Sequence, residues 1–134
     1  MSQENLEVVQ RAFEMADRDG LEGIIKFIDM AWAPDGEMRA GRLPDAGPAR
    51  GPEAVKNWWR QLFEEIDLRV EPEEYIDAGD AIVIVARQIA RGHASGAEVE
   101  QRLTWVCGLR AGKVTYVDVF RTKAEALEAV GLRE

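Results

Sequence analysis

Cysteine and histidine are almost absent from this chain of 134 residues, which contains one of each, Cys107 and His93. A single cysteine cannot form an intrachain disulfide or a CxxC pair, and one histidine with one distant cysteine cannot build a zinc site. We therefore expect no metal and no other cofactor. Cys107 lies in an apolar run between Val106 and Gly108, which favours the role of a small buried hydrophobic residue.

Basic residues and long apolar runs are scarce as well. Lysine and arginine total 17 against 25 aspartate and glutamate residues, which gives a net charge of −8. Such a balance repels phosphate backbones and anionic lipids, so neither nucleic acid nor a membrane is an expected partner. The polar start Met1–Asn5 is unlike a secretory leader, and no apolar run approaches the roughly 18 residues of a membrane span. We expect a cytoplasmic protein.

The composition is otherwise typical of a globular protein, with 46% hydrophobic and 31% charged residues. The length fits a single domain over residues 1–134. A chain of this size buries roughly two-thirds of the surface that it exposes when unfolded. That burial provides a core with room for a pocket, without help from disulfides or metals.

Apolar residues recur at helical spacing in three segments of the first half of the chain. The segments contain Leu6, Val9, Phe13 and Ala16; Leu21, Ile24, Ile25 and Ile28; and Val55, Trp58, Trp59, Leu62, Phe63 and Ile66. Gly20 ends the first predicted helix, and Pro52 suits the first turn of the third. Closely spaced prolines and glycines between Trp32 and Pro52 predict a loop with one short strand, over Glu37–Ala40.

The second half of the chain predicts four strands and a final helix. The strands run over 68–76, 81–91, 98–109 and 113–120, with turn residues between them. Thr122 and Glu125 form a T-x-x-E capping box, and Gly131 ends the helix that it opens. Helices that are segregated from consecutive hairpin-linked strands predict an α+β fold, with one curved antiparallel sheet and helices on one side.

The turn at Ala111 and Gly112 decides which face of the last strand is buried. In the strand before it, the apolar face is the one that carries Trp105. A two-residue turn pairs Arg110 with Lys113 and continues with the pairs Tyr116 and Cys107, Asp118 and Trp105, and Phe120 and Leu103. A three-residue loop would send Asp118 to the outer face. The first register predicts an inner Asp118, where its carboxylate could serve as a general acid or base.

Several segments resemble one known family. They are Asp19-Gly20-Leu21-Glu22-Gly23, the opening Gly51-Pro52-Glu53-Ala54-Val55, the stretch Tyr75–Asp80, and the tail from Gly112 to Leu127. Together with the element order, they make the chain similar, from about residue 5 to residue 132, to the SnoaL-like branch of the NTF2-like superfamily. The resemblance implies a cone, in which a curved sheet wraps over about three N-terminal helices with a short C-terminal helix. It also implies an apolar pocket in the cone and a homodimer.

Members of that superfamily include polyketide cyclases, ketosteroid isomerases, limonene epoxide hydrolases, dehydratases and proteins without known activity. Asp118-Val119-Phe120 is similar to the D-x-F ending where the cyclases and epoxide hydrolases place their acid/base aspartate. The hydrolases also need an Arg-x-Asp pair, and here Arg87-Gln88-Ile89 ends in isoleucine. The isomerases need a tyrosine on the first helix and a carboxylic acid where this chain has Trp105. The resemblance therefore implies a catalytic role for Asp118 and disfavours both of those activities.

We expect a protein that binds a small hydrophobic molecule in the cone. The expected binding residues are Trp105, Phe120, Tyr116, Cys107, Leu103, Trp59, Phe63 and Phe13. Two functions stay open: a cofactor-independent enzyme of the cyclase, isomerase or hydrolase type with Asp118 as acid/base, or a non-catalytic ligand-binding or dimeric interaction module. Of the four tryptophans, at most two are expected to line a cavity, because aromatic residues at helical spacing usually belong to the core.

Other polar residues and the sheet surface give further expectations. Arg87 and Arg91 either flank an anion in the pocket or lie on the outer face, and the outer face is favoured because arginine is rarely buried without a partner. His93 is expected at an exposed hairpin tip rather than as a general base. The strand over 81–86 is apolar on both faces, which predicts a homodimer joined through the outer face of the sheet.

Overall fold

The computed structural model describes residues 2–39 and 48–132. The helices are α1 (Ser2–Asp19), α2 (Leu21–Ala31), α3 (Pro52–Glu65) and α4 (Lys123–Ala129). The strands are β1 (Trp32–Met38), β2 (Ala49–Arg50), β3 (Ile66–Asp77), β4 (Ala81–Gly92), β5 (Glu98–Arg110) and β6 (Lys113–Phe120). The predicted helices and the last four strands are confirmed. The short strand expected over Glu37–Ala40 begins earlier, at Trp32, and Ala40 lies outside the described residues.

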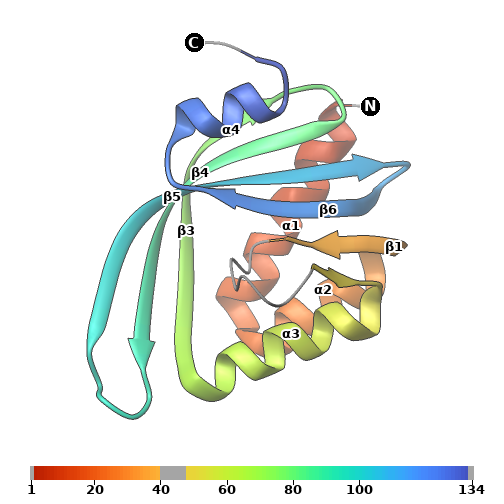
Figure 1. The fold of residues 1–134 in the computed structure, drawn as a ribbon. Coiled ribbons are helices and arrows are strands. Elements are labelled where there is room, and N and C mark those ends of the chain that lie inside the picture. The colour runs from red at the N-terminus through yellow and green to blue at the C-terminus, as the bar shows by residue number, and fades with distance from the viewer. Residues whose placement is uncertain (1, 40–47, 133–134) are drawn as a thin grey trace.

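The strands form one sheet in the order β2-β1-β6-β5-β4-β3. Neighbouring strands are antiparallel except β1 and β6, which are parallel. The expected antiparallel sheet is therefore a mixed one. β1 and β6 are far apart in the chain, so no hairpin turn imposes an antiparallel orientation on them. In Figure 1, α1 runs behind the strands from the N-terminus at the upper right, α2 and α3 lie in the lower half of the view, and α4 lies at the top.

Alternate residues of β4 and β5 point into two separate apolar clusters, because successive side chains of a strand face opposite sides of the sheet. On the inner face, Ile82 and Ile84 of β4 pack with Trp105 and Cys107 of β5 and with side chains from α1, α2 and α3. This inner cluster is the main core of the molecule, and it surrounds the candidate site.

The outer cluster lies under α4. Ala81 and Val83 of β4 and Val106 of β5 pack there against Ala126 and Leu127 of the helix. Val83 is 0% exposed as a result. α4 of the same chain therefore covers Ala81 and Val83, whereas Val85 is half-buried and lies outside this cluster, so the homodimer through the outer face stays a prediction.

A capping hydrogen bond defines the start of α4. The Thr122 side chain accepts a hydrogen bond from the Glu125 backbone N–H at 3.1 Å, which confirms the predicted capping box.

Within the described part of the chain, no helix combines the length and the apolar character that crossing a bilayer requires.

Candidate functional site

A β-bulge in β6 determines which residues of this strand face the core. Arg110 pairs with Lys113 across a two-residue turn, as predicted, and Ala111 and Gly112 have the positive φ angles of 51° and 78° that such a turn favours. Leu109 then pairs with Val114, but Gly108 pairs with Tyr116, which leaves Thr115 as an extra residue. Every pair beyond the bulge is shifted by one residue.

The bulge turns Asp118 to the outer face. Asp118 lies opposite Val106, and Val119 occupies the predicted place opposite Trp105. The predicted register was therefore wrong, because the extra residue at Thr115 reverses the faces of all later side chains. The Asp118 carboxylate accepts a hydrogen bond from the Val119 backbone N–H at 2.9 Å. The acid/base assignment of Asp118 loses the geometry on which it was based.

Three of the eight expected binding residues do not line the cavity. Tyr116 and Phe120 also face outward and pack beside the outer cluster. The Tyr116 ring covers Gly108 so closely that a Cβ atom there would lie 2.1 Å from its Cε1 atom, and the Arg39 guanidinium carbon lies 4.4 Å from the centroid of the ring. Leu103 pairs with Ala86 on the inner face but is not among the lining residues.

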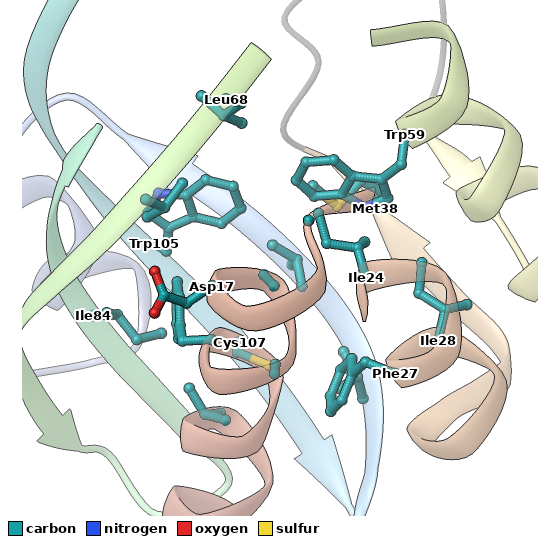
Figure 2. A pocket seen from close by; sticks show the side chains of 18 of the residues that line it. Asp17, Ile24, Phe27, Ile28, Met38, Trp59, Leu68, Ile84, Trp105 and Cys107 are labelled. Carbon is teal, nitrogen blue, oxygen red and sulfur yellow. The ribbon is translucent and has the colours of Figure 1, made fainter. Parts of the chain in front are cut away.

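The inner face of the sheet and helices α1, α2 and α3 surround a cavity of about 320 Å³ (Figure 2). Five of the expected binding residues line it, namely Phe13, Trp59, Phe63, Trp105 and Cys107. The lining residues that the sequence interpretation did not select are Val9, Ala12, Ala16, Asp17, Gly20, Ile24, Phe27, Ile28, Trp32, Met38, Leu68, Arg69, Val70, Ile84, Val114 and Val117. Most of the wall is therefore aliphatic or aromatic.

The helical and strand spacings that predict the elements also explain why these side chains face the cavity. The lining residues of α1 run from Val9 to Asp17 at helical spacing, so they form one stripe of the helix. On β3, Leu68 and Val70 are two residues apart and share a face. On β6, the bulge lets Val114 and Val117 both face inward although they are three residues apart.

Tryptophan dominates one side of the cavity. Three of the four tryptophans line it, Trp32, Trp59 and Trp105, which is more than the expected one or two. The rings of Trp59 and Trp105 extend toward each other from α3 and β5 (Figure 2), with centroids 6.4 Å apart and planes within 7° of parallel. Trp32 fits because position 36 is glycine, since a Cβ atom there would lie 2.5 Å from the indole nitrogen. These flat faces suit a ligand that contains rings.

Few polar groups reach the cavity. Among the described lining residues only Asp17 and Arg69 are charged, and both are exposed at its rim. Burial raises the pKa of the Cys107 thiol to about 12, so this group is neutral at physiological pH. Over residues 2–39 and 48–132, no group of three or more His, Cys, Asp or Glu side chains is placed to hold a metal ion.

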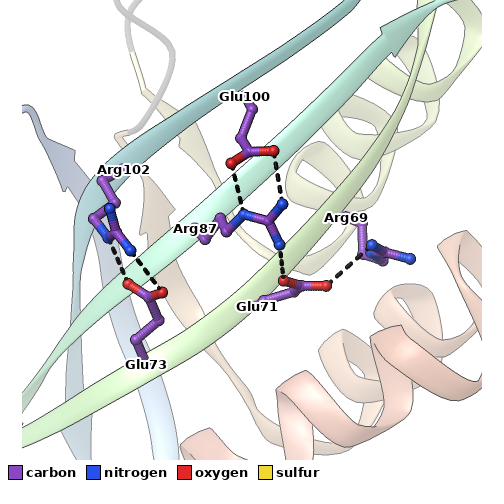
Figure 3. A network of polar contacts seen from close by, with 6 residues as sticks. All are labelled: Arg69, Glu71, Glu73, Arg87, Glu100 and Arg102. Carbon is purple, nitrogen blue, oxygen red and sulfur yellow. Dashed lines mark hydrogen bonds and ion pairs between the residues drawn. The ribbon is translucent and has the colours of Figure 1, made fainter.

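The remaining polar candidates lie away from the cavity. Arg87 faces outward, as favoured, and forms hydrogen-bonded ion pairs at 2.7 Å with Glu71 of β3 and Glu100 of β5 (Figure 3). Arg91 is exposed near the end of β4. His93 lies at the β4–β5 hairpin tip, where its ring bonds to Asp67 and to the Glu64 carbonyl.

Comparison with known proteins identifies the family. Residues 9–117 match the model of the SnoaL-like domain. The chain belongs to the SnoaL-like family. No curated protein matches the sequence. Solved structures of SnoaL-like and NTF2-like proteins do match, and they confirm the predicted α+β fold.

Three of these structures illustrate the likeness. An NTF2-like protein of unknown function from Burkholderia pseudomallei has 20% identity and a TM-score of 0.75, with 96% of this chain and 98% of that chain covered. A candidate SnoaL-like polyketide cyclase from Jannaschia sp. CCS1 has 22% identity and a TM-score of 0.77, covering 96% and 92%. A protein from Mycobacterium tuberculosis in complex with estradiol-17β-hemisuccinate has 19% identity and a TM-score of 0.72, covering 90% and 95%. At these identities the likeness establishes the fold alone.

Proposed function

We propose that this SnoaL-like protein binds one small, largely apolar molecule of about two or three rings in the cavity under the sheet. The observation that carries this proposal is the lining itself, which is apolar apart from Asp17 and Arg69 at the rim. Transfer of an apolar molecule into such a site removes both surfaces from water, at about 25 cal/mol for each Å² of apolar surface buried.

The size of the ligand follows from the cavity volume of about 320 Å³. An apolar protein cavity of about 150 Å³ is large enough to take up benzene. Twice that volume suits two or three fused or linked rings, and it lies near the lower end of the range for drug-sized ligand sites. The Mycobacterium tuberculosis relative was solved with a ligand derived from estradiol, which supports a ring-containing ligand here.

Binding without turnover is the function that the geometry favours. A general acid or base must come within hydrogen-bond distance of the proton that it transfers. Asp118, the residue selected from the sequence for that task, lies on the face of β6 that is turned away from the cavity. We therefore prefer the ligand-binding module to the cyclase, isomerase or hydrolase alternative.

The homodimer implied by the family resemblance is kept as a separate proposal. α4 covers Ala81 and Val83 on the outer face of β4, so a dimer through this face would use the part of the sheet that α4 leaves uncovered. Light scattering that gives a mass of about twice 15.0 kDa would support a dimer, and a mass of about 15.0 kDa would contradict it.

A cavity-filling variant tests the binding proposal. Ala16 lines the cavity, so the ring in Ala16→Phe would occupy ligand space, whereas Ala124→Phe adds the same ring to the exposed surface of α4. We expect titration calorimetry with 2-naphthylmethanol, a neutral two-ring probe, to detect one site in the wild type and in Ala124→Phe. Binding to Ala16→Phe should be at least about tenfold weaker. Equal affinity in all three proteins, or no binding to the wild type, would overturn the proposal.

A further inference from the structure

Asp17 occupies an unusual position on α1. It follows Phe13 by four residues and Val9 by eight, so it continues the stripe of the helix that faces the cavity. Figure 2 shows its carboxylate on the side of the helix that faces Ile84 and Trp105. A charged residue in the apolar stripe of an amphipathic helix indicates a functional role, because hydrophobic residues normally occupy these positions.

The Asp17 carboxylate is also unpaired. No hydrogen bond or ion pair connects it to another described residue. The arginine beside it in the sequence, Arg18, pairs with Asp19 at 3.3 Å. An exposed carboxylate without a partner at the rim of an apolar cavity is free to bind a cation or a hydrogen-bond donor.

The other charged group at the rim is already neutralised. The Arg69 guanidinium pairs with Glu71 at 3.0 Å, and Glu71 also pairs with Arg87 at 2.7 Å (Figure 3). Leu68 and Val70 on either side of Arg69 line the cavity, so strand alternation turns the Arg69 side chain toward the outer face. Arg69 is therefore poorly placed to bind an anionic ligand.

The interior of the cavity is also suited to positive charge. Trp59 and Trp105 present indole rings, and ring faces carry the negative part of the aromatic quadrupole, which attracts ammonium groups. The net charge of −8 adds a field that favours the approach of cations over anions. The rim carboxylate, the tryptophan wall and the net charge of the chain thus all favour a positively charged ligand.

We infer that the ligand of this cavity is an aromatic or polycyclic amine, whose rings lie among the tryptophans and whose ammonium group is held at the rim by Asp17. The inference rests on the proposed binding function and adds the chemical class of the ligand. Asp17 is the specificity-determining residue, because it distinguishes a cationic ligand from a neutral or anionic one with the same rings.

Three probes with one ring system separate the contributions of the rings and the charge. They are 2-naphthylmethylamine, which is cationic at neutral pH, the neutral 2-naphthylmethanol and the anionic 2-naphthoate. For the wild type we expect the amine to bind about threefold to tenfold more tightly than the alcohol, the range of a partly exposed ion pair with a cation–π contribution. The anion should bind most weakly.

Two matched variants locate the source of the preference. Asp17→Asn removes the rim carboxylate, and Asp19→Asn makes the same change two residues away in a side chain that does not line the cavity. We expect Asp17→Asn to lose most of the preference for the amine over the alcohol, because only the smaller cation–π contribution of the tryptophans remains. Asp19→Asn should keep the preference of the wild type, and salt should weaken only the amine preference.

The outcomes separate this inference from the proposed function. If the wild type binds the alcohol as tightly as the amine, or if Asp17→Asn keeps the amine preference, the inference is wrong while ring binding in the cavity stands. If the anion binds most tightly, the charge assignment is also wrong. If none of the three probes binds, the proposed function fails together with the inference.

Discussion

Asp118 lies opposite Val106 across β5 and β6, on the face of the sheet that α4 covers rather than on the face that encloses the cavity. Its carboxylate is bonded to the Val119 backbone N–H at 2.9 Å, so it has a local structural partner. Ligand binding under the sheet therefore has no direct contact with this side chain.

We expect Asp118→Asn to leave ligand affinity unchanged, because the substitution keeps the size of a side chain that does not line the cavity. The dissociation constant of 2-naphthylmethanol, measured by titration calorimetry, should stay within about twofold of the wild-type value. Ala16→Phe serves as the contrasting variant on the cavity wall. A tenfold loss of affinity in Asp118→Asn would contradict the placement of this side chain away from the ligand.

Cys107 should react very slowly with thiol reagents in the folded protein. The nucleophile is the thiolate, and a pKa of about 12 leaves roughly one thiol in ten thousand ionised at about pH 8. A colourimetric disulfide reagent should therefore label the denatured chain at once and the native chain over a much longer time. A bound two-ring probe should slow the reaction further, because Cys107 lines the cavity. Immediate labelling of the native protein would contradict the burial of this side chain.

His93 should contribute more to stability at acidic than at alkaline pH. Its Nε2 and Nδ1 atoms lie 2.9 Å from the Asp67 carboxylate and the Glu64 carbonyl oxygen. Both bonds favour the protonated ring, and they raise the His93 pKa above its ordinary value of 6.5, with the Asp67 bond as the larger cause. The stabilisation is therefore complete below about pH 6.5 and is lost as the pH rises through the folded-state pKa.

An NMR titration of the His93 ring measures that pKa directly. The wild type should titrate above 6.5, and Asp67→Asn should lower the value. Urea unfolding should find a larger stability difference between the wild type and His93→Gln at about pH 5.5 than at about pH 9. A wild-type pKa at or below 6.5 would mean that the two hydrogen bonds do not hold the charged ring in solution.

Leu127→Ala should destabilise the protein by about 2–4 kcal/mol, the usual range for removing a buried leucine side chain. Leu127 is 5% exposed and packs over Val83 and Val106 of the sheet. Glu128→Ala is the matched control on the exposed side of the same helix and should change the free energy of unfolding by less than about 0.5 kcal/mol. Equal, small effects in both variants would show that α4 is not firmly packed on the sheet.

The sequence predicts the elements of this fold better than their registers. The helical stripe that begins at Val55 and the alternation around Trp105 are long, regular signals. Both predict the correct type of element, although Ile66 at the end of the stripe is already the first residue of β3. Thr115 is different, because nothing in Val114-Thr115-Tyr116 distinguishes a bulge residue from an ordinary strand residue. That single residue decides the face of Asp118, so the register prediction was wrong while the fold prediction was confirmed.

Two parts of the cavity wall show where local patterns succeed and fail. Asp17 could have been found from the sequence, because it continues the spacing of Val9 and Phe13. Trp32 and Met38 could not, because β1 lies in a stretch rich in proline and glycine and is held by parallel pairing with the distant β6. Such non-local pairing leaves no periodic signal in the strand itself.

The position of β3 at one edge of the sheet limits how copies of this chain can associate. Its outer edge pairs with no other strand in the described part of the chain. Pro72 has no N–H group to offer, Glu73 forms the bulge beside it, and Arg69 and Glu71 are charged. These features discourage a further strand from joining a sheet edge. Any self-association is therefore expected to use a face of the molecule and not a continuous sheet that runs from one copy into the next through β3.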